Sequence, residues 1–499
     1  MNKFIFLASV FAILFSITSY TQNSFEISFS TSDDELISAS ATDHNGNTIL
    51  VGSKGNLVDQ FYNALLIKVL SDGNYIVKQF DSPDIYSVFG SINILENGNY
   101  FITGSIGENA NMDDCNEFWV VILDDSLNVL TTSTFNIPPE YLYLSSERVS
   151  IIDNEGNISM VGLVARQDEQ RIISDFYALK LNQLGDSLVT RVYNSWPSSR
   201  TNSLSKLPNT DSLMLIGKGA LLNGFESVNI MDRDMNIIRI SELAIENSER
   251  TCYSPDLWLN DSEFIASINR IYDKNRSREY QFAVYKINTS GEYIDELILD
   301  RRDTLEYVSR DKGMAFSADS IIFVSGFQSY NQLWTDIPSK PIVYMVDKHL
   351  NLLGRKELGG DAYYDTWGTI ATSDGGCIIY GTRYINTGAY ERDIHIWKLL
   401  REDFEIITSV EDYPINKLLA KAWPNPADNL LHISLEGFEA GQDFRLRIYD
   451  IAGQKYLDKA YIVSGNTVQC QIDVLPSGTY VYEIQTADGQ VGGGKFIKK

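Results

Sequence analysis

The chain has few of the side chains on which many catalytic and metal sites depend. It contains only four histidines among 499 residues, and no His-Glu-x-x-His pair occurs. His44 and His349 fall in predicted turns, and His395 lies in a strand pattern whose equivalents elsewhere carry apolar residues. Neither a Gly-x-Ser-x-Gly elbow nor a glycine loop for phosphate is present. These absences exclude the common zinc, serine-nucleophile and nucleotide-binding motifs.

Basic side chains are also scarce. Lys and Arg number 41 against 66 Asp and Glu, which gives a formal net charge of −25. Nucleic-acid phosphates require a basic surface, so the composition predicts no nucleic-acid partner. An acidic balance favours solubility outside the cell and attraction of cationic partners.

Long apolar runs are limited to the amino terminus. Met1–Lys3 is a short basic start, and Phe4–Ile17 is an apolar run interrupted only by two serines. We predict a signal peptide over residues 1–21, cleaved before Gln22, which sends the chain through the Sec route into the periplasm. No later stretch approaches 18 apolar residues, so no transmembrane segment is expected in the mature protein.

Four cysteines are present, in a compartment where disulfides can form. Cys377 and Cys470 lie in strand patterns, where a lone cysteine usually acts as a small buried apolar residue. Cys115 and Cys252 lie in predicted loops and are the only pair considered for a bridge, with free thiols as the open alternative.

The chain repeats between residues 25 and 410. A strand that ends in Lys or an apolar residue and is followed by a turn recurs seven times, at intervals of about 55 residues. The anchors of the repeat are Lys68, Ile122, Lys180, Ile230, Lys286, Met345 and Lys398. Upstream of most anchors lies a turn and a second apolar strand that ends in glycine, as in Tyr100–Gly104; the fifth copy lacks the glycine.

Each repeat reads as four antiparallel strands, which is typical of a β-propeller blade. We predict an all-β chain with a seven-bladed β-propeller over residues 22–410. Ser373–Gly381 resembles the Asp-Gly-Gly propeller repeats of secreted Bacteroidota proteins. Phe25–Phe29 has no blade of its own and is expected to pair with blade seven and close the ring, although Phe404–Thr408 competes for that place. A β-solenoid is the structural alternative, disfavoured because its repeats are shorter.

Loop lengths predict a working face. The interblade connections and the loops from second to third strands are long, and alternating strand direction puts both sets at one end of the ring. Aromatic side chains there suit stacking on sugars or anchoring a protein. The residues predicted to form a ligand face are Tyr62, Trp196, Tyr330, Trp334, Tyr363, Tyr364 and Tyr384. For each single residue the alternative is packing between blades.

The same end is rich in carboxylates: Asp33, Asp34, Glu35, Asp84, Glu140, Glu147, Asp303, Glu306, Asp311, Asp361 and Asp365. Converging carboxylates could bind Ca²⁺, but no spacing matches a calcium loop, so no cofactor is predicted and a solvated surface is favoured. Asp43–Asn47 resembles such a loop but falls at a hairpin turn. Paired carboxylates on this face could alternatively serve a glycosidase or lyase.

The last residues form a separate β domain. Val468, Cys470, Ile472 and Val474 alternate with polar residues, as half-buried strands do. About seven short strands fit this length as an immunoglobulin-like sandwich. We place a linker at 411–421 and this domain at 422–499.

This domain resembles the type A C-terminal sorting domain of the type IX secretion system of Gram-negative bacteria of the Bacteroidota type. The motifs are an opening Pro-Asn-Pro, a Tyr-Asp-x-x-Gly turn, a Leu-Pro-Ser-Gly-Thr-Tyr strand entry and a basic terminus. Their residues are Pro424, Asn425, Pro426, Tyr449, Asp450, Gly453, Pro476, Gly478, Tyr480, Lys498 and Lys499. The resemblance implies passage to the cell surface or medium and recognition by the type IX machinery.

Together these features predict a secreted or cell-surface binding protein with a glycan or protein ligand, and not an enzyme. The alternative is an extracellular carbohydrate-active enzyme that uses acidic residues of the long-loop face.

Overall fold

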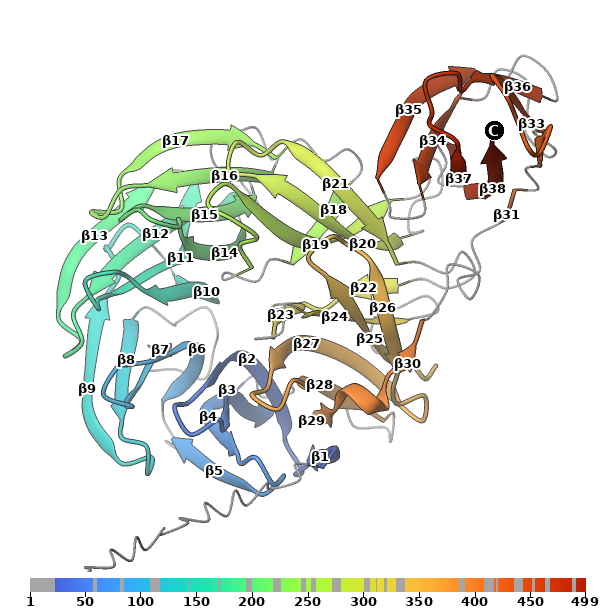
Figure 1. Ribbon diagram of the computed structural model, residues 1–499. Helices are drawn as coiled ribbons and strands as arrows, with labels where there is room; N and C mark the ends of the chain where they lie inside the picture. Colours follow the sequence, from blue (N-terminus) through green and yellow to red (C-terminus); the bar gives the residue numbers. More distant parts are fainter. Residues whose placement is uncertain are drawn as a thin grey trace, which may run out of the picture. The chain divides into compact units, whose positions relative to one another are not determined.

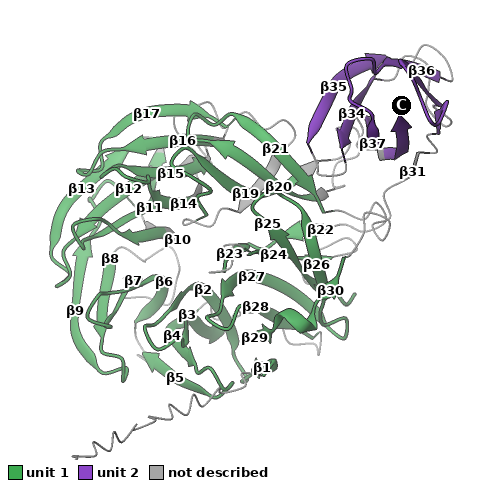
Figure 2. Cartoon of the chain, viewed as in Figure 1, with its two compact units in different colours: residues 1–407 green, residues 408–499 purple. Residues whose placement is uncertain are grey.

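The computed structural model of the protein describes residues 23–56, 61–80, 85–107, 117–141, 143–168, 171–193, 200–218, 226–243, 248–252, 257–271, 280–299, 306–310, 312–317, 321–328, 337–385, 391–407, 417–418, 421–434, 443–450, 454–462, 467–486 and 491–499. The chain divides into two compact units, residues 1–407 and 408–499 (Figure 2). The predicted signal peptide lies outside the described residues. No helix in the described part is both long and apolar enough to cross a membrane.

The described residues of unit 1 form seven antiparallel sheets, numbered here in chain order. Sheet one contains β2 (Asp34–Thr42), β3 (Thr48–Asn56), β4 (Phe61–Val69) and β5 (Tyr75–Phe80). Sheet two contains β6 (Tyr86–Ile94), β7 (Tyr100–Gly107), β8 (Glu117–Leu123) and β9 (Val129–Asn136). Sheet three contains β10 (Tyr143–Ile152), β11 (Ile158–Asp168), β12 (Arg171–Leu181) and β13 (Ser187–Tyr193). Sheet four contains β14 (Arg200–Lys206), β15 (Leu213–Lys218), β16 (Glu226–Met231) and β17 (Ile237–Glu242).

The remaining sheets follow the same plan with variations at their edges. Sheet five contains β18 (Ser248–Cys252), β19 (Glu263–Ile271), β20 (Tyr280–Asn288) and β21 (Tyr293–Ile298). Sheet six contains β22 (Glu306–Val308), β23 (Met314–Phe316), β24 (Ile321–Gln328), β25 (Lys340–Asp347), β26 (Leu352–Glu357) and β30 (Glu405–Ile406). Sheet seven contains β27 (Tyr363–Ala371), β28 (Cys377–Tyr384), β29 (Arg392–Leu399) and β1 (Phe25–Phe29), and a 3₁₀ turn, η2 (Arg401–Asp403), follows β29.

The sheets of unit 1 are arranged as a ring (Figure 1). Each neighbouring pair shares one buried apolar cluster, and sheet seven shares one with sheet one, so the series of clusters is closed. Between sheets seven and one, for example, Tyr380 and Ile396 pack with Leu50 and Ile67. The seven repeat anchors lie in β4, β8, β12, β16, β20, β25 and β29, the third strand of each four-stranded unit. The all-β prediction of a propeller followed by a small β-sandwich is confirmed.

The amino-terminal strand closes the ring, as predicted. β1 pairs antiparallel with β29, with Ile27 opposite Ile396. The competing segment has a different place, because β30 adds to the outer edge of sheet six, where Ile406 lies opposite Gly354. The two ends of the propeller segment therefore occupy the edges of two neighbouring sheets.

The repeated glycine faces an irregularity in the innermost strand. In six sheets the pairing between the first two strands shifts register, at Ser38 in sheet one and at Trp367 in sheet seven, for example. In sheet six, residues 309–313 separate β22 from β23. The glycine of the second strand lies beside this bulge, and a Cβ on Gly104 would approach the carbonyl oxygen of Val88 to 2.4 Å. Glycine is needed there because the bulged backbone comes too close for any side chain.

At the opposite end of the sheets, lysines of alternate third strands pair with carboxylates near the turn between the first two strands. Lys68 lies 3.2 Å from Asp43, and its ammonium also donates to the carbonyl of Asp125 in sheet two. The equivalent pairs are Lys180 with Asp153 at 2.7 Å, Lys286 with Glu263 at 2.9 Å and Lys398 with Asp374 at 2.7 Å. Buried charges require such partners, and the bond to Asp125 ties two sheets together. These lysines are anchors of the sequence repeat, but their acidic partners were not predicted.

Unit 2 is a β-sandwich. One sheet has the order β31 (Lys417–Leu418), β38 (Val491–Lys498), β37 (Gly478–Thr486), β34 (Asp443–Asp450) and β35 (Lys455–Ile462). The other has the order β32 (Ala422–Trp423), β33 (Leu430–Ser434) and β36 (Thr467–Gln471). Their inner faces share one core that includes Leu446, Cys470 and Phe496. The segment expected to be a linker thus contains a strand, since β31 pairs in parallel with β38.

Replacing Gly104 with alanine is expected to destabilise the propeller by about 1–3 kcal/mol, because the new methyl group overlaps a backbone oxygen that cannot rotate away. Thermal unfolding of the purified protein measures the effect. Gly478→Ala is the control, since its nearest neighbour would be 3.7 Å away. Equal melting temperatures for Gly104→Ala and the wild type would contradict the bulge explanation.

Candidate functional site at the long-loop end

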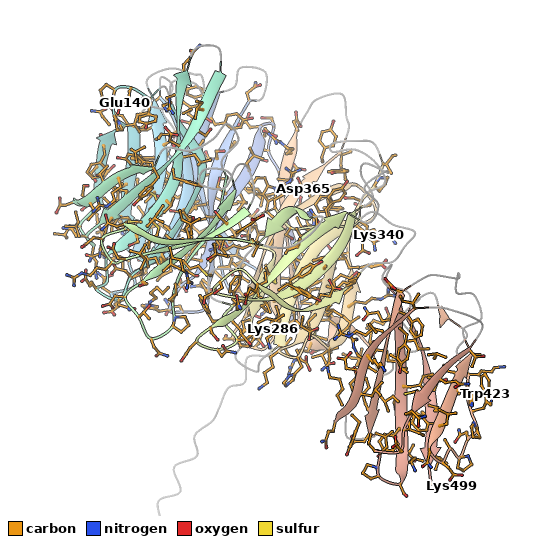
Figure 3. The ribbon with its side chains drawn as sticks, turned by 90° about the horizontal axis from the view of Figure 1, so that it is seen from above. Glu140, Lys286, Lys340, Asp365, Trp423 and Lys499 are labelled. Carbon is orange, nitrogen blue, oxygen red and sulfur yellow. The ribbon has the colours of Figure 1, made fainter. Side chains whose placement is uncertain are left out.

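The connections between sheets, and the links from second to third strands, meet at one end of unit 1, called here the long-loop end. Figure 3 shows Glu140, on the connection between β9 and β10, and Asp365, near the start of β27, toward this end, whereas Lys286 lies toward the other. Many loop tips of this end lie outside the described residues. The described part shows mainly the bases of the loops.

Four of the seven aromatics predicted for a ligand face are buried in the structure. Tyr62, Tyr363, Tyr364 and Tyr384 are each 5% exposed or less. The Tyr62 hydroxyl donates to Asp34 over 2.8 Å, and the Tyr364 hydroxyl donates to Asp361 over 2.8 Å. These side chains pack between neighbouring sheets, as the alternative interpretation expected, and do not form an accessible face. Trp196, Tyr330 and Trp334 lie outside the described residues.

Several carboxylates of this end are buried as well, which corrects the expectation of a solvated surface. Asp34, Glu35, Glu306 and Asp365 are between 0% and 2% exposed. Glu306 accepts hydrogen bonds from Gln328 (2.8 Å) and from the Tyr344 hydroxyl (2.9 Å), and Asp365 pairs with Arg310. The expectation failed because charge alone indicates solvent, whereas partners from distant strands make burial possible.

Asp34 connects the last sheet to the first. Its carboxylate accepts bonds from the guanidinium and from the backbone N–H of Arg392, at the start of β29. Tyr62 of β4 is the third donor to the same carboxylate. Burial and the Asp34 carboxylate raise the pKa of the Tyr62 hydroxyl, so it remains a donor. This group of three side chains joins sheets one and seven at the long-loop end.

Glu35, the next residue, is completely buried and incompletely paired. Thr31 donates to one carboxyl oxygen, whereas the other has no hydrogen-bond partner among the described residues. Burial raises the pKa of Glu35 from 4.5 to about 7, with contributions in the same direction from Asp393 and Asp33. Two groups lower the pKa of Glu35: the hydrogen bond from Thr31, and the charge of Lys54, which lies opposite Glu35 in β3.

Asp393 of β29 is the second carboxyl of this cluster. Burial raises its pKa, with Glu391 acting in the same direction, whereas Ser30 and Arg383 lower it. Of these two carboxyls on neighbouring sheets, Glu35, with a pKa of about 7, is the one that retains its proton near neutral pH. Glu35 and Asp34 are both closed to solvent, so the described conformation presents neither of them to an external substrate.

A hydroxyl network on the inner strands was not predicted. The Ser309 hydroxyl lies 2.6 Å from that of Ser325 and donates to Thr366 over 3.0 Å. Next to it, the backbone N–H of Lys312 donates to the carbonyl of Trp367, and the Lys312 ammonium donates to the carbonyl of Ser40 over 2.9 Å. Residues of sheet six are thereby hydrogen-bonded to sheets seven and one. No sequence pattern indicates this link, because it depends on the break between β22 and β23.

The described residues contain no group of three or more His, Cys, Asp or Glu side chains placed to hold a metal ion. The expectation of no cofactor, with Ca²⁺ as the open alternative, stays untested. His395 is buried, and its Nε2 lies 2.8 Å from Glu26 of β1. Burial lowers the pKa of His395, and the Glu26 carboxylate opposes that shift.

Cys377 and Cys470 are free and buried, as predicted. Cys115 and the Cys252 side chain lie outside the described residues.

The sorting motif of unit 2 converges at one edge of the sandwich. Asn425 accepts a hydrogen bond from the backbone N–H of Ile497 (2.9 Å) and donates to the carbonyl of Lys495 (3.4 Å). Two backbone bonds of Ala427, with Ile497 and Lys499, continue this pairing. The opening Pro-Asn-Pro and the basic end of the chain are therefore one structural element, although some 70 residues separate them.

The other motif residues shape turns and the core. The Tyr480 hydroxyl donates to the carbonyl of Pro476 over 2.8 Å, and its ring stacks on Phe496. Asp450 accepts from the backbone N–H of Gln454 at the end of β34, and Tyr449 donates to Glu483 over 3.3 Å. Gly478 begins β37, whereas Gly453 lies outside the described residues. Lys498 is 9% exposed, and its ammonium donates to the carbonyl of Lys499.

Fold and motif together define a β-propeller chain with a β-sandwich of the sorting type. Residues 421–499 match the family model of the secretion system C-terminal sorting domain. The match supports the assignment to the type IX system and implies export to the cell surface or the medium. No curated protein matches the chain.

Solved structures resemble the chain only distantly. A novel fungal alcohol oxidase of the AA5 family, in complex with copper, is 12% identical with a TM-score of 0.44, over 96% of this chain and 99% of its own. The acylaminoacyl peptidase of Pyrococcus horikoshii is 12% identical with a TM-score of 0.41, over 82% of this chain and 59% of its own. The α-L-arabinanase of Penicillium chrysogenum is 10% identical with a TM-score of 0.37, over 61% of this chain and 91% of its own. Similarity at this level carries no information about activity.

Replacing Glu35 with glutamine is expected to remove a pH dependence of stability. The unfolded chain loses this proton near pH 4.5 and the folded chain near pH 7, so stability falls as pH rises between these values. The wild type should lose about 3 kcal/mol more than Glu35→Gln across this window, since each pKa unit is worth about 1.4 kcal/mol. Denaturant titrations at pH 4.5, 6 and 7.5 measure the difference; parallel curves for the two proteins would refute it.

Proposed function

We propose that this protein is a secreted or cell-surface β-propeller of the Bacteroidota type that binds a glycan or protein ligand at its long-loop end. In this proposal a signal peptide leads the chain through the Sec route into the periplasm. The sorting domain then directs it through the type IX machinery. The observation that carries the export part is the family match over residues 421–499, together with the pairing of Asn425 with the last strand.

The binding part rests on how the long-loop end is supported. Buried polar groups, such as Asp34 with Arg392 and Glu306 with Tyr344, fix the bases of the loops. Loops held on a rigid scaffold are common carriers of recognition. The proposed contacts are the three aromatics of the predicted ligand face that lie outside the described residues, Trp196, Tyr330 and Trp334.

Deleting residues 421–499 should retain the propeller in the periplasm of a cell that carries the secretion system. Cell fractionation and immunoblotting of the medium, the cell surface and the periplasm measure this outcome. A propeller that keeps its normal melting temperature after the deletion shows that retention is not caused by misfolding. Unchanged export would overturn the sorting assignment.

Trp334→Ala should lower ligand binding at least tenfold on a glycan array or against extracellular protein fractions, since a stacking indole is lost. Tyr75→Ala is the matched control, because Tyr75 is 43% exposed on the outer strand β5. Equal effects of the two changes would count against a ligand face at the long-loop end.

A carbohydrate-active enzyme that uses carboxyls of the long-loop end is the second candidate. The pKa of about 7 at Glu35 suits a proton donor, but this carboxyl is buried in the described conformation and would have to become accessible to a substrate. A carboxyl that stays protonated near neutral pH is the usual proton donor in glycoside hydrolysis. Release of reducing sugar by the wild type and its loss in Glu35→Gln would support this function. Absence of release by the wild type across a polysaccharide panel would reject it.

A further inference from the structure

The outward face of β38 presents a short strip of basic and apolar side chains. Along this strand Phe496 and Lys498 are buried, while Lys495, Ile497 and Lys499 between and beyond them are exposed. This alternation is the period of a strand with one face on the core. Ile497, at the centre of the strip, is 47% exposed. The strip is defined here as Lys495, Ile497 and Lys499.

The strip is held in place from its free edge. Asn425 bonds to the backbone of Lys495 and Ile497, and Ala427 bonds to the backbone of Ile497 and Lys499. The exposed Pro424 and Pro426 flank these contacts and cannot donate backbone hydrogen bonds themselves. Asn425 is therefore a positioning residue, and the strip is a preformed surface.

The cations of the strip differ from three others on the same sheet, which have acidic partners. On β34 Arg447 pairs with Glu483 of β37 at 3.2 Å, and on β35 Lys455 pairs with Asp458 at 2.8 Å. Arg445 also pairs with Asp458. Neither Lys495 nor Lys499 has an acidic partner among the described residues of unit 2. An exposed cation without a local counter-ion is available to a partner.

The charge of this domain also departs from that of the chain. Residues 421–499 contain eight Lys and Arg and nine Asp and Glu, whereas the whole chain has 41 and 66. A basic strip on a nearly neutral domain would attract an acidic surface that the rest of the chain repels. The strip is small, and small interfaces suit transient contacts. An exported protein that must be released from its transporter requires a contact of this kind.

We propose that the strip of Lys495, Ile497 and Lys499 is the surface by which the sorting domain docks on an acidic protein surface with an apolar contact at its centre. This inference rests on the proposed export function and deepens it by naming the contact surface and the chemistry of its partner. The acidic partner supplies carboxylates to both ammonium groups, and Ile497 is covered between them. Lys498 lies outside the contact because its side chain is buried.

The test is export of the full-length chain carrying Lys495→Glu, Ile497→Ser and Lys499→Glu together. The surface and medium fractions should fall at least tenfold, with accumulation in the periplasm. Lys495→Arg with Lys499→Arg should be exported within twofold of the wild type, since charge is retained. Lys459→Glu with Ile462→Ser is the matched control on β35, where Ile462 is 68% exposed, and it should also export normally.

Hydrogen exchange of the purified full chain verifies that unit 2 stays folded in each variant, with protection at Phe444–Ile448 as the reference. Flotation with vesicles of phosphatidylcholine and phosphatidylglycerol tests the membrane as an alternative partner. Vesicle binding by the wild type that the triple change abolishes would overturn the proposal in favour of lipid headgroups.

The outcomes separate this inference from the export function itself. Normal export of the folded triple variant, while deletion of residues 421–499 blocks export, would refute the docking strip and leave the sorting assignment intact. Normal export after the deletion would refute the sorting assignment and the docking strip together. If the triple variant fails the exchange test, Lys499→Glu alone replaces it, because this change affects a single exposed side chain. Lys499→Glu should lower export at least threefold. A smaller decrease would overturn the docking strip.

Discussion

Burial of apolar side chains between neighbouring sheets is the interaction on which the rest of this structure depends. A single four-stranded sheet has two faces and cannot cover both of them by itself. Each sheet of unit 1 therefore contributes one face to the cluster before it and the other to the cluster after it. Sheet two shows this: Ile102 packs toward sheet one, and Phe101, its neighbour in β7, packs toward sheet three.

The polar features follow from this arrangement. Because the faces are apolar, these charges lie near the ends of the strands. Their partner comes from the same sheet, as with Lys68 and Asp43 at one end, or from the neighbouring sheet, as with Asp34 and Arg392 at the other. Glu35 stands out because it is as deeply buried as these groups but has fewer donors, and for that reason its proton is retained to near neutral pH.

Local patterns in the sequence were sufficient to predict the architecture. The spacing of anchors such as Lys180 and the glycine of the second strand placed the repeats, and the unpaired pattern at Phe25–Phe29 predicted ring closure. The repeated glycine is visible in the sequence. The reason for it is not, because the bulge that requires a glycine lies in another strand. The fifth sheet lacks that glycine, and its register shifts between Ser248 and Arg250, opposite Arg270 and Asn269, beyond the position that the glycine would occupy.

The candidate site was less predictable because its chemistry depends on partners far apart in the chain. Asp34 and Arg392 are separated by more than 350 residues, and nothing local to either indicates the other. Tyr363 and Tyr364 were taken for loop residues, whereas they begin the innermost strand β27, where both faces are covered. In unit 2 the motif residues were found from resemblance, but the distinction between the buried Lys498 and the exposed Lys499 required the strand register.

The antiparallel pair of β1 and β29 has a consequence for the order in which the chain can fold. Most sheets are built from consecutive strands, so they can form as soon as those strands are available. The final pair joins residues at opposite ends of the propeller segment, and contacts of such long sequence separation form slowly. The propeller is thus an open arc until β29 has emerged. A chain that crosses the inner membrane from its amino terminus can complete the circle only after nearly all of the propeller has reached the far side.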